Sequence, residues 1–126
     1  MLVLKNKIIL TAENTVLTNG NPIEHAEINL LNLAHQKLSS KIITQSTIFC
    51  STEPCVMCKG AIYWSGIRKI VYGCSAKSLG KITEHGLEIN SEEILLRGSE
   101  VTEISGPHME EEAIKIHQHY WPSILL

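Results

Sequence analysis

Short apolar runs alternate along this chain with longer stretches in which apolar residues recur at helical spacing. Five runs are predicted to be strands, because they are short, mostly apolar and bounded by polar turns. These runs are Leu2–Leu4, Ile8–Thr11, Thr47–Cys50, Ile70–Tyr72 and Val101–Ile104. The polar turn Lys5-Asn6-Lys7 makes the first two a hairpin. The uninterrupted run Ile70-Val71-Tyr72 is typical of a parallel strand that is buried on both faces.

Helical spacing is clearest from Glu24 to Leu38, where apolar residues three or four positions apart form one stripe. Further helices are predicted over Cys55–Ser65, around Ile94–Leu96 and over Glu110–Tyr120, and Asn14–Pro22 carries turn residues. Strands and helices therefore alternate, which predicts an α/β fold in which helices cover a sheet.

Composition indicates one ordinary compact domain. A chain of 126 residues, 44% of them hydrophobic, can bury one core, and no repeat, low-complexity tract or linker divides it. We expect a single domain over residues 1–126. No apolar stretch approaches the length of a membrane span, and the start Met1–Lys5 is too short and too soon charged for a secretory signal. The sequence thus predicts a cytoplasmic protein without a membrane partner.

Charge argues modestly against a nucleic-acid partner. The net charge is -2, all thirteen acidic residues are Glu, and nine of them lie from Glu84 to Glu112, where Arg97 is the only opposing charge. Proteins that grip a nucleic-acid backbone normally present a basic patch. The one candidate is the loose set Lys59, Arg68, Lys69, Lys77 and Lys81. Small-molecule substrates are therefore favoured over tRNA.

Two motifs carry the chemistry: His25-Ala26-Glu27 and Pro54-Cys55-Val56-Met57-Cys58. His25, Cys55 and Cys58 supply three zinc-type ligands, whereas a structural zinc usually has four protein ligands and a catalytic zinc keeps one position for water. Glu27 then remains for proton transfer. The predicted helices place both motifs at helix amino ends, whose positive dipole ends favour thiolates. The sequence therefore predicts a hydrolytic Zn²⁺ site rather than a structural one.

The segment Ser51-Thr52-Glu53-Pro54-Cys55-Val56-Met57-Cys58-Lys59-Gly60-Ala61-Ile62 resembles the cytidine and deoxycytidylate deaminase superfamily. Within it, the chain is most similar to guanine deaminases and tRNA adenosine deaminases. The resemblance implies a three-layer α/β/α sandwich with a mixed, five-stranded sheet, a zinc cofactor and a homodimer. It also implies a helix before the first strand, and that helix is expected to be missing here because the sequence starts inside the strand.

Residue by residue, the resemblance makes His25, Cys55 and Cys58 the zinc ligands and Glu27 the proton shuttle. Asn14 matches the asparagine that binds the substrate base, and the backbone N–H of Ala26 matches a second contact. The step Tyr63-Trp64 is similar to guanine deaminases, in which a tryptophan lies near the purine.

Other positions give expectations of smaller weight. Glu84, Glu88 and Glu112 are candidates for a later acidic residue that binds the base, and Tyr120 or Trp121 for closing a partner's pocket. Glu53 is expected to order the metal loop through backbone contacts, and Cys50 and Cys74 to be small buried residues.

The implied reaction is hydrolytic deamination of a purine base or nucleoside, with guanine converted to xanthine and ammonia as the preferred case. Two alternatives stay open. One is deamination of the wobble adenosine of tRNA, and the other is a non-catalytic zinc-binding subunit that pairs with an active partner. Such subunits often lack the glutamate, so the presence of Glu27 argues against the second.

Overall fold

A single mixed sheet of five strands organises the structure, a computed structural model that describes residues 1–84, 87, 89 and 91–122. The strands are β1 (Leu2–Leu4), β2 (Lys7–Leu10), β3 (Thr47–Thr52), β4 (Lys69–Cys74) and β5 (Glu103–Ser105). Their order is β2-β1-β3-β4-β5. The β1 strand pairs antiparallel with β2 and β3, whereas β3, β4 and β5 are parallel. The predicted mixed sheet is confirmed.

The amino-terminal hairpin turns at Lys5 and Asn6. Both residues have left-handed backbone angles, with φ of 48° and 62°, and Leu4 pairs with Lys7 across the turn. Two consecutive left-handed residues give the turn a twist that matches the right-handed twist of the strands. The hairpin therefore follows from the polar turn residues that the sequence places between two apolar runs.

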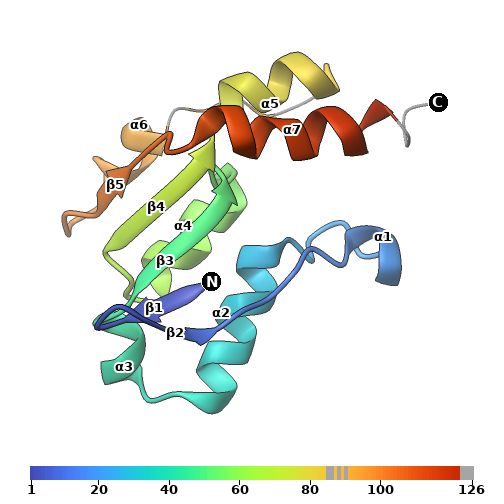
Figure 1. Cartoon of the computed structure of the whole chain (residues 1–126). Coiled ribbons are helices and arrows are strands. Elements are labelled where there is room, and N and C mark those ends of the chain that lie inside the picture. Colours follow the sequence, from blue (N-terminus) through green and yellow to red (C-terminus); the bar gives the residue numbers. More distant parts are fainter. Residues whose placement is uncertain (85–86, 88, 90, 123–126) are drawn as a thin grey trace.

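Helices cover both faces of the sheet (Figure 1). They are α1 (Val16–Asn19), α2 (Ala26–Lys37), α3 (Ser40–Thr44), α4 (Val56–Trp64), α5 (Ala76–Thr83), α6 (Ser91–Leu95) and α7 (Glu110–Tyr120). The α2 and α4 helices pack on one face, and α5 and α7 run side by side on the other. The result is the expected three-layer α/β/α sandwich.

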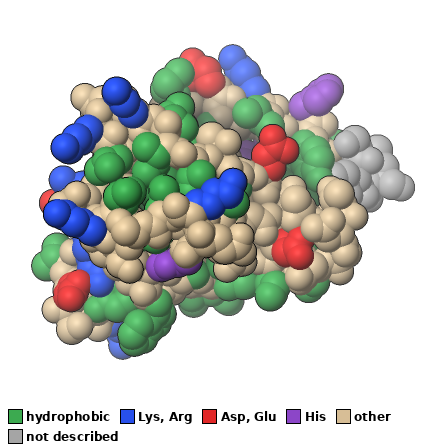
Figure 2. All heavy atoms as spheres, turned by 90° about the horizontal axis from the view of Figure 1, so that it is seen from below, with side chains coloured by type: hydrophobic (Ala, Val, Ile, Leu, Met, Phe, Trp, Pro, Cys, Tyr) green, Lys and Arg blue, Asp and Glu red, His purple; other side chains and the backbone are tan. Residues whose placement is uncertain are grey.

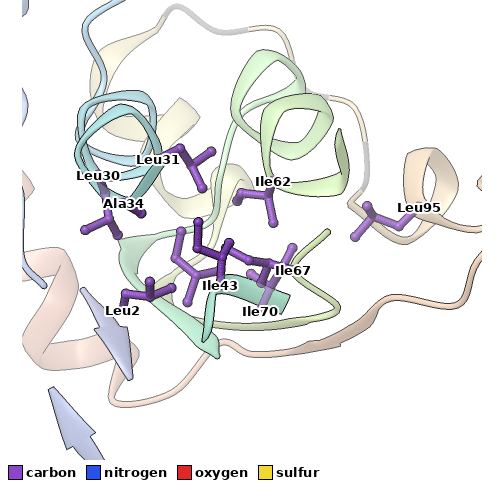
Figure 3. Close-up of a cluster of buried hydrophobic side chains, with 10 residues drawn as sticks. Leu2, Leu30, Leu31, Ala34, Ile43, Ile62, Ile67, Ile70 and Leu95 are labelled. Carbon is purple, nitrogen blue, oxygen red and sulfur yellow. The ribbon is translucent and has the colours of Figure 1, made fainter. Parts of the chain in front are cut away.

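The main core lies between the sheet and the helices α2, α3, α4 and α6 (Figure 3). Its side chains are at most 5% exposed and come from elements far apart in the sequence. They are Leu2, Leu30, Leu31, Ala34, Ile43, Ile48, Ile62, Ile67, Ile70 and Leu95. This core fixes α2 and α4, which carry the two motifs, against the same face of the sheet.

On the opposite face, α7 approaches β4 closely at Gly73. A Cβ atom at this position would lie 2.7 Å from the Ser51 carbonyl oxygen and 3.1 Å from the Cβ of Ala113. Only glycine leaves room for such close contact between a strand, its neighbour and a helix. Gly73 therefore sets how α7 sits on the sheet.

The elements predicted from the pattern are all present, with ends that either match or shift by up to three residues. The α2 helix begins at Ala26 rather than Glu24, because His25 is its N-cap. Three helices, α1, α3 and α5, were not predicted. The first two have four and five residues, and α5 depends on a cap in which the Ser75 side chain accepts from the Ser78 N–H. Such short helices leave little periodicity for a sequence pattern to detect.

All four cysteines are free. Cys74 is fully buried and Cys50 is half-buried, close to the expectation for both. Across the described ranges, every helix is too short or too polar to cross a membrane.

Candidate active site

The three predicted zinc ligands meet in space although thirty residues separate them in sequence. The sulfurs of Cys55 and Cys58 each lie 3.6 Å from Nδ1 of His25, and the three ligand atoms are all within 4.8 Å of one another. A tetrahedral zinc, about 2.0–2.1 Å from nitrogen and 2.3 Å from sulfur, holds such atoms about 3.6 Å apart. The donor set therefore fits Zn²⁺ in both chemistry and spacing.

Two helix amino ends converge on this point. His25 is the N-cap of α2 and Cys55 is the N-cap of α4, and both have extended backbone angles. The first N–H groups of a helix have no intrahelical partner, and the helix dipole is positive there. The site therefore favours anionic groups, such as thiolates, a carboxylate or a developing oxyanion.

The two cysteines are electrostatically unequal. The pKa of Cys55 is lowered to about 5, chiefly by the hydrogen bond with the Cys58 side chain and, to a smaller extent, by His25. The same hydrogen bond, together with burial and the nearby Glu27 carboxylate, raises the pKa of Cys58. Cys55 is thus a thiolate at neutral pH, which is the form that binds a metal.

Glu27 lies beside the ligands and outside the three-ligand group. Its Oε2 accepts a hydrogen bond of 3.5 Å from the Cys58 sulfur, and its side chain lines a cavity of about 720 Å³. Because Glu27 reaches both the ligand set and the cavity, it is placed to move protons between the metal site and a bound molecule.

Residues from several elements line the cavity together with Glu27. They include Glu13, Ala26, Phe49, Cys50 and Tyr72. Burial, and then the Glu27 carboxylate, raises the pKa of the Cys50 thiol, so Cys50 adds no charge to the cavity wall. The volume is within the range of about 300–1,000 Å³ that is typical of small-molecule sites.

Asn14 lies next to this cavity but is not among its lining residues. Its side-chain oxygen accepts from the Val16 N–H at 3.0 Å, which is a local turn, and the residue is exposed. The loop that carries Asn14 is fixed by Glu24, whose carboxylate accepts from Thr15, Asn19 and Asn21. These hydrogen bonds, led by that from Thr15, lower the pKa of Glu24.

A second anchor of this loop comes from α2. The side-chain amide of Asn29 donates to the Glu13 carbonyl at 2.8 Å and to the Thr15 hydroxyl at 2.9 Å. Asn29 lies one turn after His25, whose carbonyl its own N–H binds. The helix that holds the first metal ligand therefore also holds the Asn14 loop.

Within this chain, Trp64 lies apart from the other predicted site residues. It stands at the carboxyl end of α4, is 86% exposed and does not line the cavity. It meets Tyr63 edge-on, with ring centroids 5.9 Å apart. Trp64 thus packs neither in the core nor around the metal ligands.

The carboxyl-terminal aromatics are held by their own helix. The Trp121 indole N–H donates to Nδ1 of His117 at 3.2 Å, and Nε2 of His117 lies 2.6 Å from the Thr52 hydroxyl. Tyr120 is 43% exposed and meets Trp121 edge-on.

The candidates for a later acidic residue do not reach the site, as far as the structure describes them. Glu84 and Glu112 are exposed and do not line the cavity, and Glu88 lies outside the described residues. Glu13, directly before Asn14, lines it beside Glu27, and so does His108. Sequence reasoning assigned neither Glu13 nor His108 to the site, since neither lies in the two motifs that carry the metal ligands.

Comparison with known proteins places this geometry in a family. A family model described as MafB19-like deaminase matches residues 1–114. A probable cytosine deaminase of Schizosaccharomyces pombe is 38% identical over 121 residues, which cover 92% of this chain and 73% of the relative. A tRNA-specific adenosine deaminase of Buchnera aphidicola is 37% identical over 81 residues, which cover 64% of this chain and 54% of the relative.

Solved structures agree in fold. A guanine deaminase from Nitrosomonas europaea superposes with a TM-score of 0.67 and 25% identity, covering 88% of this chain and 64% of that one. This chain thus spans about half of the tRNA-specific relative and nearly two thirds of the guanine deaminase. The family model matches residues 1–114, and the cytosine deaminase relative and the shared fold agree with that match. The chain therefore belongs to the MafB19-like deaminase family.

Proposed function

We propose that this protein is a zinc-dependent hydrolytic deaminase of a nucleobase or nucleoside. The observation that carries the proposal is the meeting of His25, Cys55 and Cys58 at zinc-binding distances, with the Glu27 carboxylate beside them on the cavity wall. A three-ligand site of this kind keeps a position for water. Bound zinc would supply that water with a lowered pKa, as a nucleophile at neutral pH.

Glu27 is the general acid and base of the proposed reaction. Its carboxylate accepts a proton from the attacking water and delivers it to a ring nitrogen; it then accepts the proton of the new hydroxyl group and delivers it to the amino group, which leaves as ammonia. Water is thereby consumed, the C–NH₂ bond breaks and a carbonyl forms. The Ala26 N–H, at the first position of α2, and Asn14 are proposed to hold the ring so that one carbon faces the water.

Guanine, which would yield xanthine, is the substrate that we propose from the sequence. The structural likeness to the Nitrosomonas guanine deaminase supports it. Trp64 supports it less, because within one chain its ring stands in solvent rather than near the cavity.

Cytosine is a second candidate, and a specific observation favours it. The S. pombe relative, described as a probable cytosine deaminase, matches 92% of this chain at 38% identity. Its product would be uracil, and the same water, Glu27 and metal ligands would serve, because both bases carry an amino group on a ring carbon next to a ring nitrogen.

Wobble adenosine in tRNA receives little support from the surface. Of the basic set noted in the sequence, Lys59 is only 1% exposed, Arg68 is bound to Glu100 and lies over the Tyr63 ring, and Lys69 lies 4.0 Å from Glu103. On the face that Figure 2 shows, Lys and Arg side chains gather on one side among apolar ones. A continuous basic groove is therefore not formed by that set.

We also propose a homodimer, and exposed apolar side chains support it. Trp64, Leu96 and Val101 are each more than 80% exposed, and Leu17 and Ile23 flank the loop that follows Asn14. Large apolar side chains in solvent are typical of surfaces that a partner covers.

Ammonia release by zinc-quantified protein tests the function. The substrates are guanine, cytosine, guanosine, cytidine, adenosine and an anticodon stem-loop RNA. Glu27→Gln, which keeps the shape of the side chain, should retain zinc yet lose nearly all turnover. Glu111→Gln, an exposed glutamate in the first turn of α7, is the matched control and should stay fully active.

The outcomes of this assay distinguish the candidate functions. Release from guanine or cytosine that Glu27→Gln abolishes establishes the deaminase and names its base. Release from the stem-loop alone assigns tRNA. An active Glu27→Gln variant refutes the shuttle, and silence from fully zinc-loaded protein on every substrate points to the non-catalytic subunit.

A further inference from the structure

Lys59 is a buried cation directly after the metal ligand Cys58. Its side chain is 1% exposed, and it is the largest fully buried side chain among the described residues. Its Nζ donates to Oε1 of Glu53 at 3.3 Å and to the carbonyl oxygen of Ile89 at 3.1 Å. A lysine is almost never fully buried unless it is paired, so this position needs an explanation.

Glu53, its partner, is 10% exposed and directly precedes Pro54-Cys55. Its second carboxylate oxygen accepts from the Ala76 N–H, at the start of α5, at 2.9 Å. Its own N–H donates to the carbonyl of Cys74, at the end of β4, at 2.7 Å. Glu53 therefore joins the metal loop to β4 through its backbone N–H, and to α5 and Lys59 through its side chain.

The two partners enclose the segment that carries both cysteine ligands, which is the metal loop and the first turn of α4. Glu53 stands two positions before Cys55 and Lys59 one position after Cys58, so their contact closes the segment from both ends. Inside the segment, Pro54 is buried and the Lys59 N–H donates to the Cys55 carbonyl at 2.9 Å. The positions of the two sulfurs thus depend on a loop whose ends are tied together and to neighbouring elements.

Stability alone does not account for this pair. Burying two charges removes them from water, and exchanging both partners for neutral side chains of similar volume often leaves a fold equally stable. A buried pair with fixed partners on three elements does, however, restrict the loop to one geometry. Residues that contact metal ligands and fix their orientation change metal affinity strongly when they are removed.

We propose that Glu53 and Lys59 are positioning residues that hold Cys55 and Cys58 at the separation that zinc requires. The inference rests on the zinc site of the proposed function and adds this chain's own means of setting it. It predicts that breaking the pair alters metal binding itself, before any substrate is present.

The decisive variant is Glu53→Gln/Lys59→Met. The glutamine oxygen still accepts from the Ala76 N–H, and neither substitution leaves a buried charge. The matched control is Lys69→Met/Glu103→Gln, an ion pair between β4 and β5 whose side chains are 62% and 74% exposed. Zinc affinity is measured by competition with a chromophoric chelator, and ligand geometry by the visible absorption of the Co²⁺-substituted protein.

We expect the zinc dissociation constant of the double variant to rise about 10–100-fold, with a weaker and shifted Co²⁺ band, while the control matches the wild type. Unchanged affinity and spectrum in the folded double variant would overturn the proposal. So would a double variant that fails to fold, since the pair would then serve the whole fold. Because no substrate is used, a chain that binds zinc as expected but releases no ammonia counts against the proposed function only.

Discussion

His117 offers a sharp test of how the last helix is attached to the metal loop. The Trp121 indole can only donate, so Nδ1 of His117 must accept its hydrogen bond, and Nε2 then carries the ring proton and donates to Thr52. The ring is therefore neutral. Burial lowers its pKa from the ordinary value of 6.5. Since Thr52 ends β3, directly before the metal loop, this histidine connects α7 to the site.

The change is His117→Leu, which fills similar space without ring nitrogens. It removes two hydrogen bonds and leaves the Thr52 hydroxyl and the Trp121 N–H without this partner. At roughly 0.5–1.5 kcal/mol each, the expected loss of stability is about 1–3 kcal/mol. With an unfolding entropy of about 2.1 cal/mol/K per residue, the melting temperature of a chain of this length should fall by about 4–11 °C.

The sign of the pH effect follows from the lowered pKa. Between the folded pKa and 6.5 the unfolded chain binds a proton at His117 that the folded chain does not, so stability falls as pH falls. The contribution is complete above pH 6.5 and is lost as pH falls through the folded pKa. Protonation would also place a proton on Nδ1, opposite the Trp121 N–H.

The assay is urea unfolding of wild type and His117→Leu at several pH values from 8 down to 5. The stability gap between the two proteins should be widest at pH 8 and should narrow below pH 6.5. A gap that stays constant over this range would refute the neutral, doubly bonded histidine.

Two further predictions concern the metal and the surface. Cys58→Ala should bind less than one zinc per chain and should lose the stabilisation that zinc gives the wild type. At a zinc concentration 100 times the dissociation constant, that stabilisation is about 2.7 kcal/mol, or about 10 °C in melting temperature. Differential scanning fluorimetry with and without a chelator measures it. An equal zinc-dependent shift in both proteins would contradict the ligand assignment. Trp64→Ser should weaken the proposed homodimer in sedimentation velocity while zinc content stays unchanged, because the indole is 86% exposed in one chain; an unaltered association constant would remove Trp64 from the interface.

The sequence pattern predicted the layout well where local spacing decides it. Apolar periodicity located α2 and α4, and the motifs on their first turns then placed His25, Glu27, Cys55 and Cys58 near one point. Strand β4, which contains the apolar run Ile70-Val71-Tyr72, proved parallel to both of its neighbours. These features depend on the 3.6-residue and 2-residue repeats, which a sequence shows directly.

Features that depend on distant partners could not be predicted. Lys59 was counted as a surface cation, because nothing in its neighbourhood indicates that Ile89 and Glu53 would enclose it. The Glu24 network likewise depends on the loop bringing Thr15 within reach. Polar side chains find their partners only after the apolar core has fixed the elements, so their roles follow from the fold.

The strand order also has a consequence for the growing chain. His25, Cys55 and Cys58 all precede β4 in the sequence, so the three proposed metal ligands are synthesised before β4 and β5. The parallel strands β4 and β5, and the helices α5 and α7 that pack beyond them, come later from the ribosome. The ligands are therefore available for a metal before the wall that completes the cavity, including Tyr72 and His108, has been made.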